Sequence, residues 1–245
     1  MRRNNFFQVI IILSFLINLC QDIGSIVIQN NEYSSPHSKN INLNFSQQTL
    51  SSIHFDNYNP IKIEGDTDFH NQALSGGWQG NGTKRDPYLI VGYNITSSGS
   101  DNLISIENTN VHFKISNCYL IDGFYGIRLY NVRNGYIDHN TVQNNSGSGI
   151  LLSHSNNCSI ESNYVFYNGN GIYLDFSGNN TVSNNNISTN RLSGVYSFSS
   201  VNNIYVTNTI NNNIGSGIFL DSSVGSNIIS NNKIAKNSNG LHLSF

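Results

Sequence analysis

Five side chains are of the types that acid–base chemistry on a sugar would use. Asp138, His139 and Glu161 lie in two successive copies of a repeated pattern, and Asp175 and Asp221 lie at matching positions two copies apart. A glycoside hydrolase needs two carboxylates separated by about 5 to 9 Å. A polysaccharide lyase or epimerase needs a base beside the acidic carbon and a cation, such as Ca²⁺, that neutralises the uronate. These five residues are therefore the candidate catalytic residues.

The spacing of these residues favours catalysis only weakly. Asp138 and Glu161 follow the same apolar position of the repeat, so we expect them one turn apart, too close for a sugar between them. Asp175 and Asp221 are expected about 9 to 10 Å apart, a separation that suits an inverting hydrolase. Arg133 is the only cation expected near Asp138, which is less positive charge than a lyase site needs.

Metal and nucleic-acid sites have little support in the sequence. Charged residues make up 11% of the chain, the net charge is -2, and Lys and Arg form no basic patch of the kind that binds nucleic acid. The seven histidines show no H-x-x-H spacing and the cysteines no C-x-x-C spacing. We therefore expect no metal or cofactor, with Ca²⁺ possible but unsupported. We expect Cys118 and Cys158 to be free thiols.

A row of aromatic residues is the stronger functional signal. The residue between two inward apolar positions is Tyr173, then Tyr196, then Phe219 in successive copies. Rings stacked about 4.8 Å apart would form a flat stripe suited to the C–H faces of sugars. The alternative is that the rings only stabilise the sheet surface by cross-strand packing. The predicted carbohydrate-binding residues are these three together with Arg128, Tyr130, Asp175 and Asp221.

A repeat of 22 to 23 residues positions all of these side chains. The full unit reads I-x-x-N-x-I-x-x-N-x-x-x-G-I-x-L, and no stretch of it has the 3.6-residue period of a helix. Its alternating apolar residues predict short strands with every second side chain inward. The pattern therefore predicts an all-β solenoid, a single-stranded parallel β-helix with three short strands in each of about six turns. The glycines that open the last strand are Gly126, Gly149, Gly171, Gly194, Gly217 and Gly240.

Two asparagines recur in every copy at fixed offsets from the apolar residues. An inward Asn can bond backbone groups at a bend that have no strand partner, and it can bond the same Asn one turn away. Asn also tolerates left-handed backbone angles. We therefore expect two structural ladders rather than functional sites. One is Asn140, Asn163, Asn185, Asn208 and Asn232, and the other is Asn145, Asn168, Asn190, Asn213 and Asn237.

The first 20 residues have the features of an export signal. Arg2 and Arg3 precede an apolar run from Phe6 to Leu19, which is short for a membrane span and typical of a signal peptide. An uncleaved membrane anchor is the alternative. We expect the mature protein to be secreted or held at the cell surface, with a periplasm-like compartment possible.

Three further segments follow the signal. Residues 21–60 form an Asn- and Ser-rich leader that we expect to be poorly ordered. Residues 61–102 are expected to cap the open end of the solenoid, as the terminal units of repeat proteins do. Trp78 is interpreted as a cap residue, with a binding role as the alternative. Residues 103–245 hold the β-helix repeats.

The repeats resemble those of a known group. The G-I-x-L and I-x-x-N-x-I patterns are similar to the right-handed parallel β-helix repeats of NosD-like and CASH-domain proteins. The segment GNGTKRDPYLIVGYNI, followed by ISIENTNVHFKISNC, is similar to the stretch that precedes such repeats. The resemblance covers about residues 61–245 and implies an exported carbohydrate-binding or sugar-hydrolysis module. Mannuronan epimerases share the repeat but carry a D-P-H-E motif, which this sequence lacks.

Three functions follow as hypotheses. The first is a surface module that binds glycan without proven catalysis, the second is a polysaccharide lyase or glycoside hydrolase, and the third is a structural or adhesion protein. A glycan is the expected partner. Leu241 and Leu243 would also lie inward in an uncovered last turn. Either a longer array or a second molecule would cover that turn, so we expect end-to-end self-association.

Overall fold

The computed structural model describes residues 57–223 and 225–245. The expected signal peptide and the expected leader up to residue 56 lie outside the described residues. The described chain consists of parallel strands that form three sheets, in which each strand pairs with its equivalents in the neighbouring turns. The prediction of an all-β parallel solenoid is confirmed.

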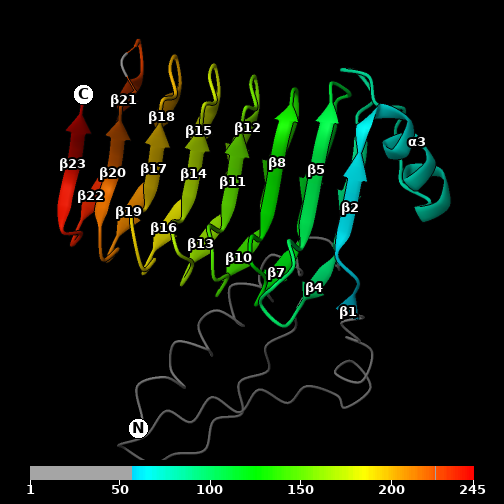
Figure 1. The fold of residues 1–245 in the computed structure, drawn as a ribbon, viewed down its shortest axis with the longest axis horizontal. Coiled ribbons are helices and arrows are strands. Elements are labelled where there is room, and N and C mark those ends of the chain that lie inside the picture. The colour runs from blue at the N-terminus through cyan, green and yellow to red at the C-terminus, as the bar shows by residue number, and fades with distance from the viewer. Residues whose placement is uncertain (1–56, 224) are drawn as a thin grey trace, which may run out of the picture. The chain divides into compact units, whose positions relative to one another are not determined.

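The three sheets are named A, B and C here, and their strands follow in spatial order. Sheet A contains β1 (Asn57–Tyr58), β4 (Asn94–Thr96), β7 (Tyr119–Ile121), β10 (Thr141–Gln143), β13 (Tyr164–Phe166), β16 (Asn186–Ser188), β19 (Thr209–Asn211) and β22 (Lys233–Ala235). Sheet B contains β2 (Ile61–Glu64), β5 (Ile104–Thr109), β8 (Ile127–Val132), β11 (Ile150–Ser153), β14 (Ile172–Asp175), β17 (Val195–Phe198), β20 (Ser216–Asp221) and β23 (Asn239–Ser244). Sheet C contains β3 (Tyr88–Val91), β6 (Phe113–Ser116), β9 (Gly135–Asp138), β12 (Ser159–Glu161), β15 (Thr181–Ser183), β18 (Ile204–Val206) and β21 (Ile228–Ser230). Figure 1 shows the strands of sheet B side by side, from cyan β2 to red β23.

The solenoid has about seven turns rather than the six expected. Seven sets of three successive strands run from β2–β3–β4 to β20–β21–β22. The additional turn comes from residues 61–102, which we expected to be only a cap. Its strands β2, β3 and β4 pair in register with β5, β6 and β7. This turn lacks the Asn positions of the repeat, so the motif did not reveal it.

A helix that the sequence analysis did not predict covers this first turn. Helix α3 (Gly65–Gly76) buries only Phe69 and Ala73, so its apolar pattern is too sparse to recognise. Gly77 ends the helix in a left-handed conformation. Phe69 stacks on Tyr88 at 5.0 Å between ring centroids and lies 6.0 Å from Trp78. The expected role of Trp78 at the end of the solenoid stays a prediction, although its ring packs against the core.

The core is a set of apolar columns that run along the solenoid. Ile150, Ile172 and Val195 are register partners in sheet B, and all three are fully buried. Gly171 shows why glycine opens each such strand. A Cβ atom there would lie 2.4 Å from Ile187 Cγ2 and 2.5 Å from the carbonyl oxygen of Gly194. Only glycine fits where the backbone of one turn approaches the next so closely.

The recurrent asparagines are buried and joined to one another along the solenoid. Asn185 Oδ1 accepts hydrogen bonds from the backbone N–H and the side-chain Nδ2 of Asn163, at 2.9 and 3.0 Å. Asn185 Nδ2 in turn donates to Asn208 Oδ1 and to the carbonyl of Ile160. The second set repeats this geometry, as when Asn168 donates through its N–H to Asn190 Oδ1. Each amide thus satisfies backbone groups at a bend in the way that the ladder prediction requires.

Two further ladders lie at bends that the sequence analysis did not recognise. Asn180, Asn203 and Asn227 form a third Asn ladder, in which each Oδ1 accepts the backbone N–H one turn earlier. A serine ladder does the same with Oγ atoms and consists of Ser155, Ser177, Ser200 and Ser223. Neither pattern was recognised in the sequence. Cys158 occupies the position of the third ladder in the copy before Asn180, so fewer asparagines recur there, and serine is common throughout the chain.

The left-handed residue at each bend is not the ladder residue itself. His139, Ser162 and Thr207 have φ between 54 and 56°, and each immediately precedes a ladder asparagine. The tolerance of Asn for left-handed angles is therefore not what the ladder positions use. The preceding residue turns the chain, and the Asn that follows points inward to bond the exposed backbone groups.

Cys118 and Cys158 are both buried and free, as expected. Burial raises the pKa of the Cys118 thiol to about 11 and that of Cys158 to about 12. No helix within the described residues is long and apolar enough to cross a membrane.

Candidate functional site

The outward residues of sheet B form two parallel columns. The first passes through Arg128, Leu151, Tyr173, Tyr196, Phe219 and His242, which are register partners in successive strands. The second passes through Glu107, Tyr130, Ser153, Asp175, Phe198 and Asp221. Because the β-helix repeats in register, the structure brings all seven predicted carbohydrate-binding residues onto one sheet.

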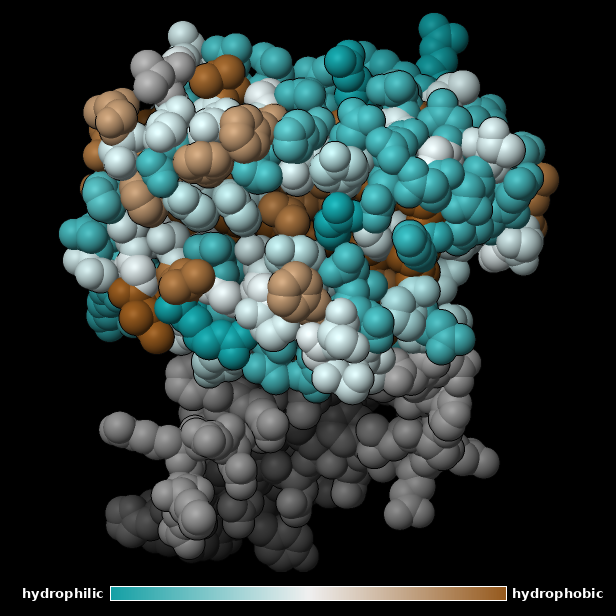
Figure 2. Space-filling view, in the orientation of Figure 1, coloured by the Kyte–Doolittle hydropathy of each residue, from teal (hydrophilic) through white to brown (hydrophobic). Residues whose placement is uncertain are grey.

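The aromatic residues of the first column form a continuous stack, called the sheet-B stripe here. Tyr173 and Tyr196 are stacked with ring centroids 4.9 Å apart, and Phe219 continues at 5.1 Å. His242 stacks on Phe219 at 4.2 Å with an interplanar angle of 3°. The three aromatic side chains are half-buried, because each ring covers part of its neighbours. Figure 2 shows hydrophobic patches gathered on the molecular surface toward the end of the solenoid that holds β20 and β23.

The two carboxylates beside the stripe bond the tyrosine hydroxyls. Tyr196 donates to Asp221 Oδ2 at 2.9 Å, and Tyr173 donates to Asp175 Oδ1 at 3.5 Å. Burial, together with the Asp221 hydrogen bond and charge, raises the pKa of Tyr196 to about 12. Burial and the Asp175 charge also raise the pKa of Tyr173. Both phenols are therefore protonated donors at neutral pH, and Asp175 and Asp221 are separated by Phe198 rather than paired.

The start of the first column carries an ion pair rather than a free cation. Arg128 Nη1 lies 2.5 Å from Glu107 Oε1, and its guanidinium carbon lies 5.1 Å from the centre of the Tyr130 ring. Both partners of this pair are mostly buried. Arg128 therefore positions Tyr130 and neutralises Glu107.

A second aromatic group borders the sheet and was missed in the sequence. His154 and Phe176 stack at 5.4 Å, and Phe176 meets Phe198 edge-on at 5.4 Å. Tyr130 lies 5.7 Å from His154 and joins this group to the second column. Phe176 is 51% exposed and has a φ of 45°. His154 and Phe176 each come directly after a residue of the second column, Ser153 and Asp175. This shared position in the repeat could have revealed the group in the sequence.

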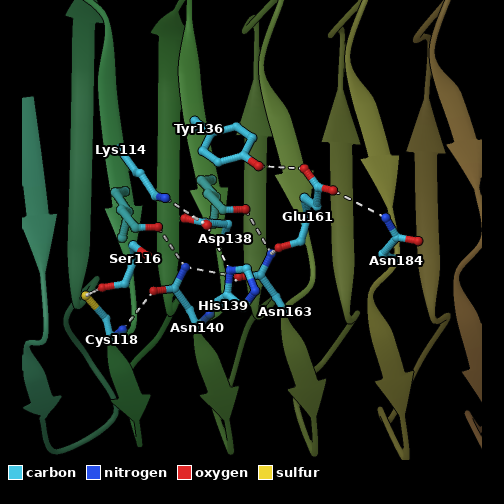
Figure 3. A network of polar contacts seen from close by, with 12 residues as sticks. Lys114, Ser116, Cys118, Tyr136, Asp138, His139, Asn140, Glu161, Asn163 and Asn184 are labelled. Carbon is cyan, nitrogen blue, oxygen red and sulfur yellow. Dashed lines mark hydrogen bonds and ion pairs between the residues drawn. The ribbon is translucent and has the colours of Figure 1, made fainter. Parts of the chain in front are cut away.

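The remaining catalytic candidates lie on sheet C (Figure 3). Asp138 and Glu161 are register partners on β9 and β12, so they occupy adjacent turns as expected. Asp138 Oδ2 lies 3.0 Å from Lys114 Nζ and 2.8 Å from His139 Nδ1. Its Oδ1 is buried and is the one buried side-chain oxygen or nitrogen without a hydrogen-bond partner in the part of the chain described.

The expectation that Arg133 is the only cation near Asp138 is wrong. Lys114 pairs with this carboxylate and also lies 5.3 Å from the centre of the Tyr136 ring. Lys114 precedes Ile115 in the least regular copy of the repeat, where Cys118 replaces the ladder asparagine. The register of β6 with β9 nevertheless places it beside Tyr136.

Glu161 has side-chain partners that differ from those of Asp138. Tyr136 donates to Glu161 Oε2 at 2.6 Å, and Asn184 Nδ2 lies 3.3 Å from Oε1. The hydrogen bond to Glu161 and burial raise the pKa of Tyr136. Tyr136 also lines a surface hollow of about 370 Å³ with Lys84, His112 and Ser159. Within the described residues no three His, Cys, Asp or Glu side chains gather closely enough to hold a metal.

His139 has the arrangement of an oriented base. A carboxylate only accepts hydrogen bonds, so contact with Asp138 favours a proton on Nδ1, and in a neutral imidazole of this kind Nε2 is the acceptor. The side chain is 61% exposed. This group of three residues therefore places an exposed imidazole beside the Lys114–Asp138 ion pair.

Comparison with known proteins identifies the architecture. The family of the right-handed β-helix region matches residues 16–165 and 102–245. A double mutant of the periplasmic alginate epimerase AlgG has a similar structure, with a TM-score of 0.56 and 22% identity over 64% of this chain and 38% of that one. A single mutant of the same enzyme gives 0.52 and 24% over 55% and 32%. This chain thus spans less than half the length of those structures, and it matches no curated protein sequence.

Residues 16–245 are covered by the two overlapping family matches, and the observed parallel strands have the architecture that the family describes. The chain therefore belongs to the right-handed β-helix family.

Proposed function

We propose that this protein is an exported β-helix module of the NosD-like or CASH type that binds polysaccharide along the sheet-B stripe. The observation that carries the proposal is the continuous row of Tyr173, Tyr196 and Phe219, with ring centroids about 5 Å apart. The exposed edges of these rings form an apolar strip on which the C–H groups of successive sugars can pack, and Asp175 and Asp221 accept hydrogen bonds from hydroxyl groups. The similarity of fold to an alginate epimerase is consistent with a polysaccharide ligand.

A glycan array combined with product analysis tests this proposal. The full chain should retain one or more polysaccharides on the array without converting them. Tyr173→Ser/Tyr196→Ser should lose that retention because it removes two adjacent rings of the stripe. The matched control is Tyr164→Ser/Tyr167→Ser, which removes two exposed tyrosines from the sheet-A side of the solenoid. Undiminished binding by a folded stripe variant would move the site elsewhere, and binding to no glycan would favour a structural or adhesion role.

The sheet-C group supports a second candidate, an elimination or hydrolysis reaction on a sugar. The specific observation is His139, whose Nδ1 contacts Asp138 while Lys114 supplies a positive charge. In this case the full chain should release shorter or unsaturated products from a polysaccharide. The products should disappear with His139→Ala and with Lys114→Met. Turnover that survives both substitutions would remove this candidate.

A further inference from the structure

The charges along the sheet-B stripe are distributed unevenly. The three strands that carry Tyr173, Tyr196 and Phe219 hold Asp175 and Asp221 but contain no Lys or Arg. Both carboxylates are part-exposed and bond the stripe tyrosines. A ligand lying on these rings would therefore meet negative charge at two places.

The cations of sheet B do not offset this charge. Arg128 is paired with Glu107 at 2.5 Å, and the pair is mostly buried. Lys62 lies on β2, at the far end of the sheet from Phe219. A uronate carboxylate on the stripe would thus have no unpaired Lys or Arg on the three strands beneath it. It would instead be repelled by the negative charges of Asp175 and Asp221.

The same carboxylates are good acceptors for an uncharged sugar. Asp175 Oδ2 accepts one bond from Ser153 Oγ, and Asp221 Oδ1 lies 3.3 Å from Ser222 Oγ. A carboxylate has about four lone-pair sites, so each retains capacity for a hydroxyl donor. We infer that the sheet-B stripe binds polysaccharides of uncharged sugars and discriminates against polyuronates, an inference that rests on the proposed function. Alginate is a polyuronate, so the stripe should reject the polymer named for the structurally similar epimerase.

Matched pairs of ligands test the inference directly. The probes are mannan and mannuronate, galactan and galacturonate, and glucan and its C6-oxidised form, as oligosaccharides of equal length. The two members of each pair have the same linkage and anomeric configuration, so that they differ only in a carboxylate in place of the hydroxymethyl group at C6. Calorimetry at neutral pH and low salt should give uncharged members a Kd about tenfold or more below that of their uronate counterparts.

Substitution of the two carboxylates should reduce this discrimination. Asp175→Asn/Asp221→Asn keeps the shape and one acceptor oxygen of each side chain but removes its charge, so uronate binding should approach that of the uncharged partner. The control Asp86→Asn removes a charge from an exposed loop before β3, on sheet C, and should leave the ratio unchanged. Salt offers a test on the unmodified protein. At 1 M salt the Debye length is about 3 Å, so the repulsion is screened and the ratio of the uronate Kd to the uncharged Kd should fall.

The outcomes separate this inference from the proposed function. Equal or tighter binding of the uronate member, lost in Tyr173→Ser/Tyr196→Ser, would overturn the inference while leaving the stripe as the site. Discrimination unchanged by the Asn substitutions and by salt would also overturn it, since its cause would not be charge. If the protein bound neither member of any pair, both this inference and the proposed glycan binding by the sheet-B stripe would be contradicted.

Discussion

At the scale of single residues, the bends of this solenoid depend on pairs of neighbours with different tasks. One residue of each pair adopts left-handed backbone angles, and the next, an inward Asn or Ser, bonds the backbone of the adjacent turn. The asparagines look like site residues in the sequence because they are polar and recurrent. Their burial and mutual hydrogen bonds favour a role in stability, which stays a prediction.

Removing one ladder asparagine should destabilise the protein measurably. Asn185→Ala would leave the backbone N–H of Asn163 and the carbonyl of Ile160 without their partners. Buried unpaired groups cost about 1 to 3 kcal/mol, so the free energy of unfolding should fall by that amount. Asn186→Ala, at the adjacent exposed position of β16, should change it by less than about 0.5 kcal/mol. Equal denaturant midpoints for the two variants would show that the ladder contributes nothing.

A substitution at the left-handed residue Thr189 should raise the stability of the protein, in contrast to the loss expected for Asn185→Ala. Its φ is 53°, an unfavourable conformation for a β-branched side chain. Thr189→Asn replaces it with a residue that adopts this conformation readily, so we expect the protein to gain about 1 kcal/mol. Chemical denaturation measures the change. A loss of stability would mean that the threonine makes contacts worth more than the strain.

At the scale of elements, the repeat predicted the strands well because its signal is physical. An inward apolar side chain, a glycine at a close approach and an asparagine at a bend each recur for a reason that acts in every turn. The first turn escaped prediction because α3 interrupts it and its bends lack the Asn. Lys114 was missed because the strand register places it beside Tyr136, and its contact with Asp138 depends on how its long side chain is oriented.

The candidate site was predictable in part for the same reason. Tyr173, Tyr196 and Phe219 share one offset in the repeat, so parallel register had to stack them. The group of His154 and Phe176 escaped because these residues lie past the strands, at left-handed bends. The partners of each carboxylate also depend on rotamers, which spacing alone does not determine.

Buried ionisable groups inside these elements should make the fold sensitive to alkali. Burial raises the pKa of Tyr205 from 10 to about 12 and that of Cys158 from 9 to about 12. The unfolded chain loses these protons first, so their contribution to stability is complete below pH 9 and falls as pH rises toward 12. Unfolding curves between pH 8 and 12 measure this loss. Tyr205→Phe should show a smaller decline above pH 10, and an identical decline would contradict the assignment.

At the scale of the whole molecule, one end of the solenoid presents an uncovered surface. The strands β21, β22 and β23 each pair on one side only. Leu241 and Leu243 are register partners of the buried Ile218 and Leu220, yet they are 46% and 45% exposed. Helix α3 and its aromatic partners cover the other end.

We propose that the chain with this sequence self-associates through that surface. Open strand edges and exposed apolar side chains favour pairing with another molecule. Light scattering over a concentration series should show dimers or larger species, and Leu241→Lys/Leu243→Lys should shift the protein toward monomer. Leu192→Lys, which alters an exposed leucine elsewhere, is the control. A strictly monomeric parent at high concentration would refute the proposal.

The position of a bound saccharide tests the central claim most directly. A crystal structure of the protein with an oligosaccharide selected on the glycan array would show which residues touch the sugar. Our account predicts sugar rings packed against the exposed edges of Tyr173, Tyr196 and Phe219, with hydroxyl groups bonded to Asp175 or Asp221. A saccharide bound instead over Lys114, Tyr136 and His139, with the stripe empty, would contradict it.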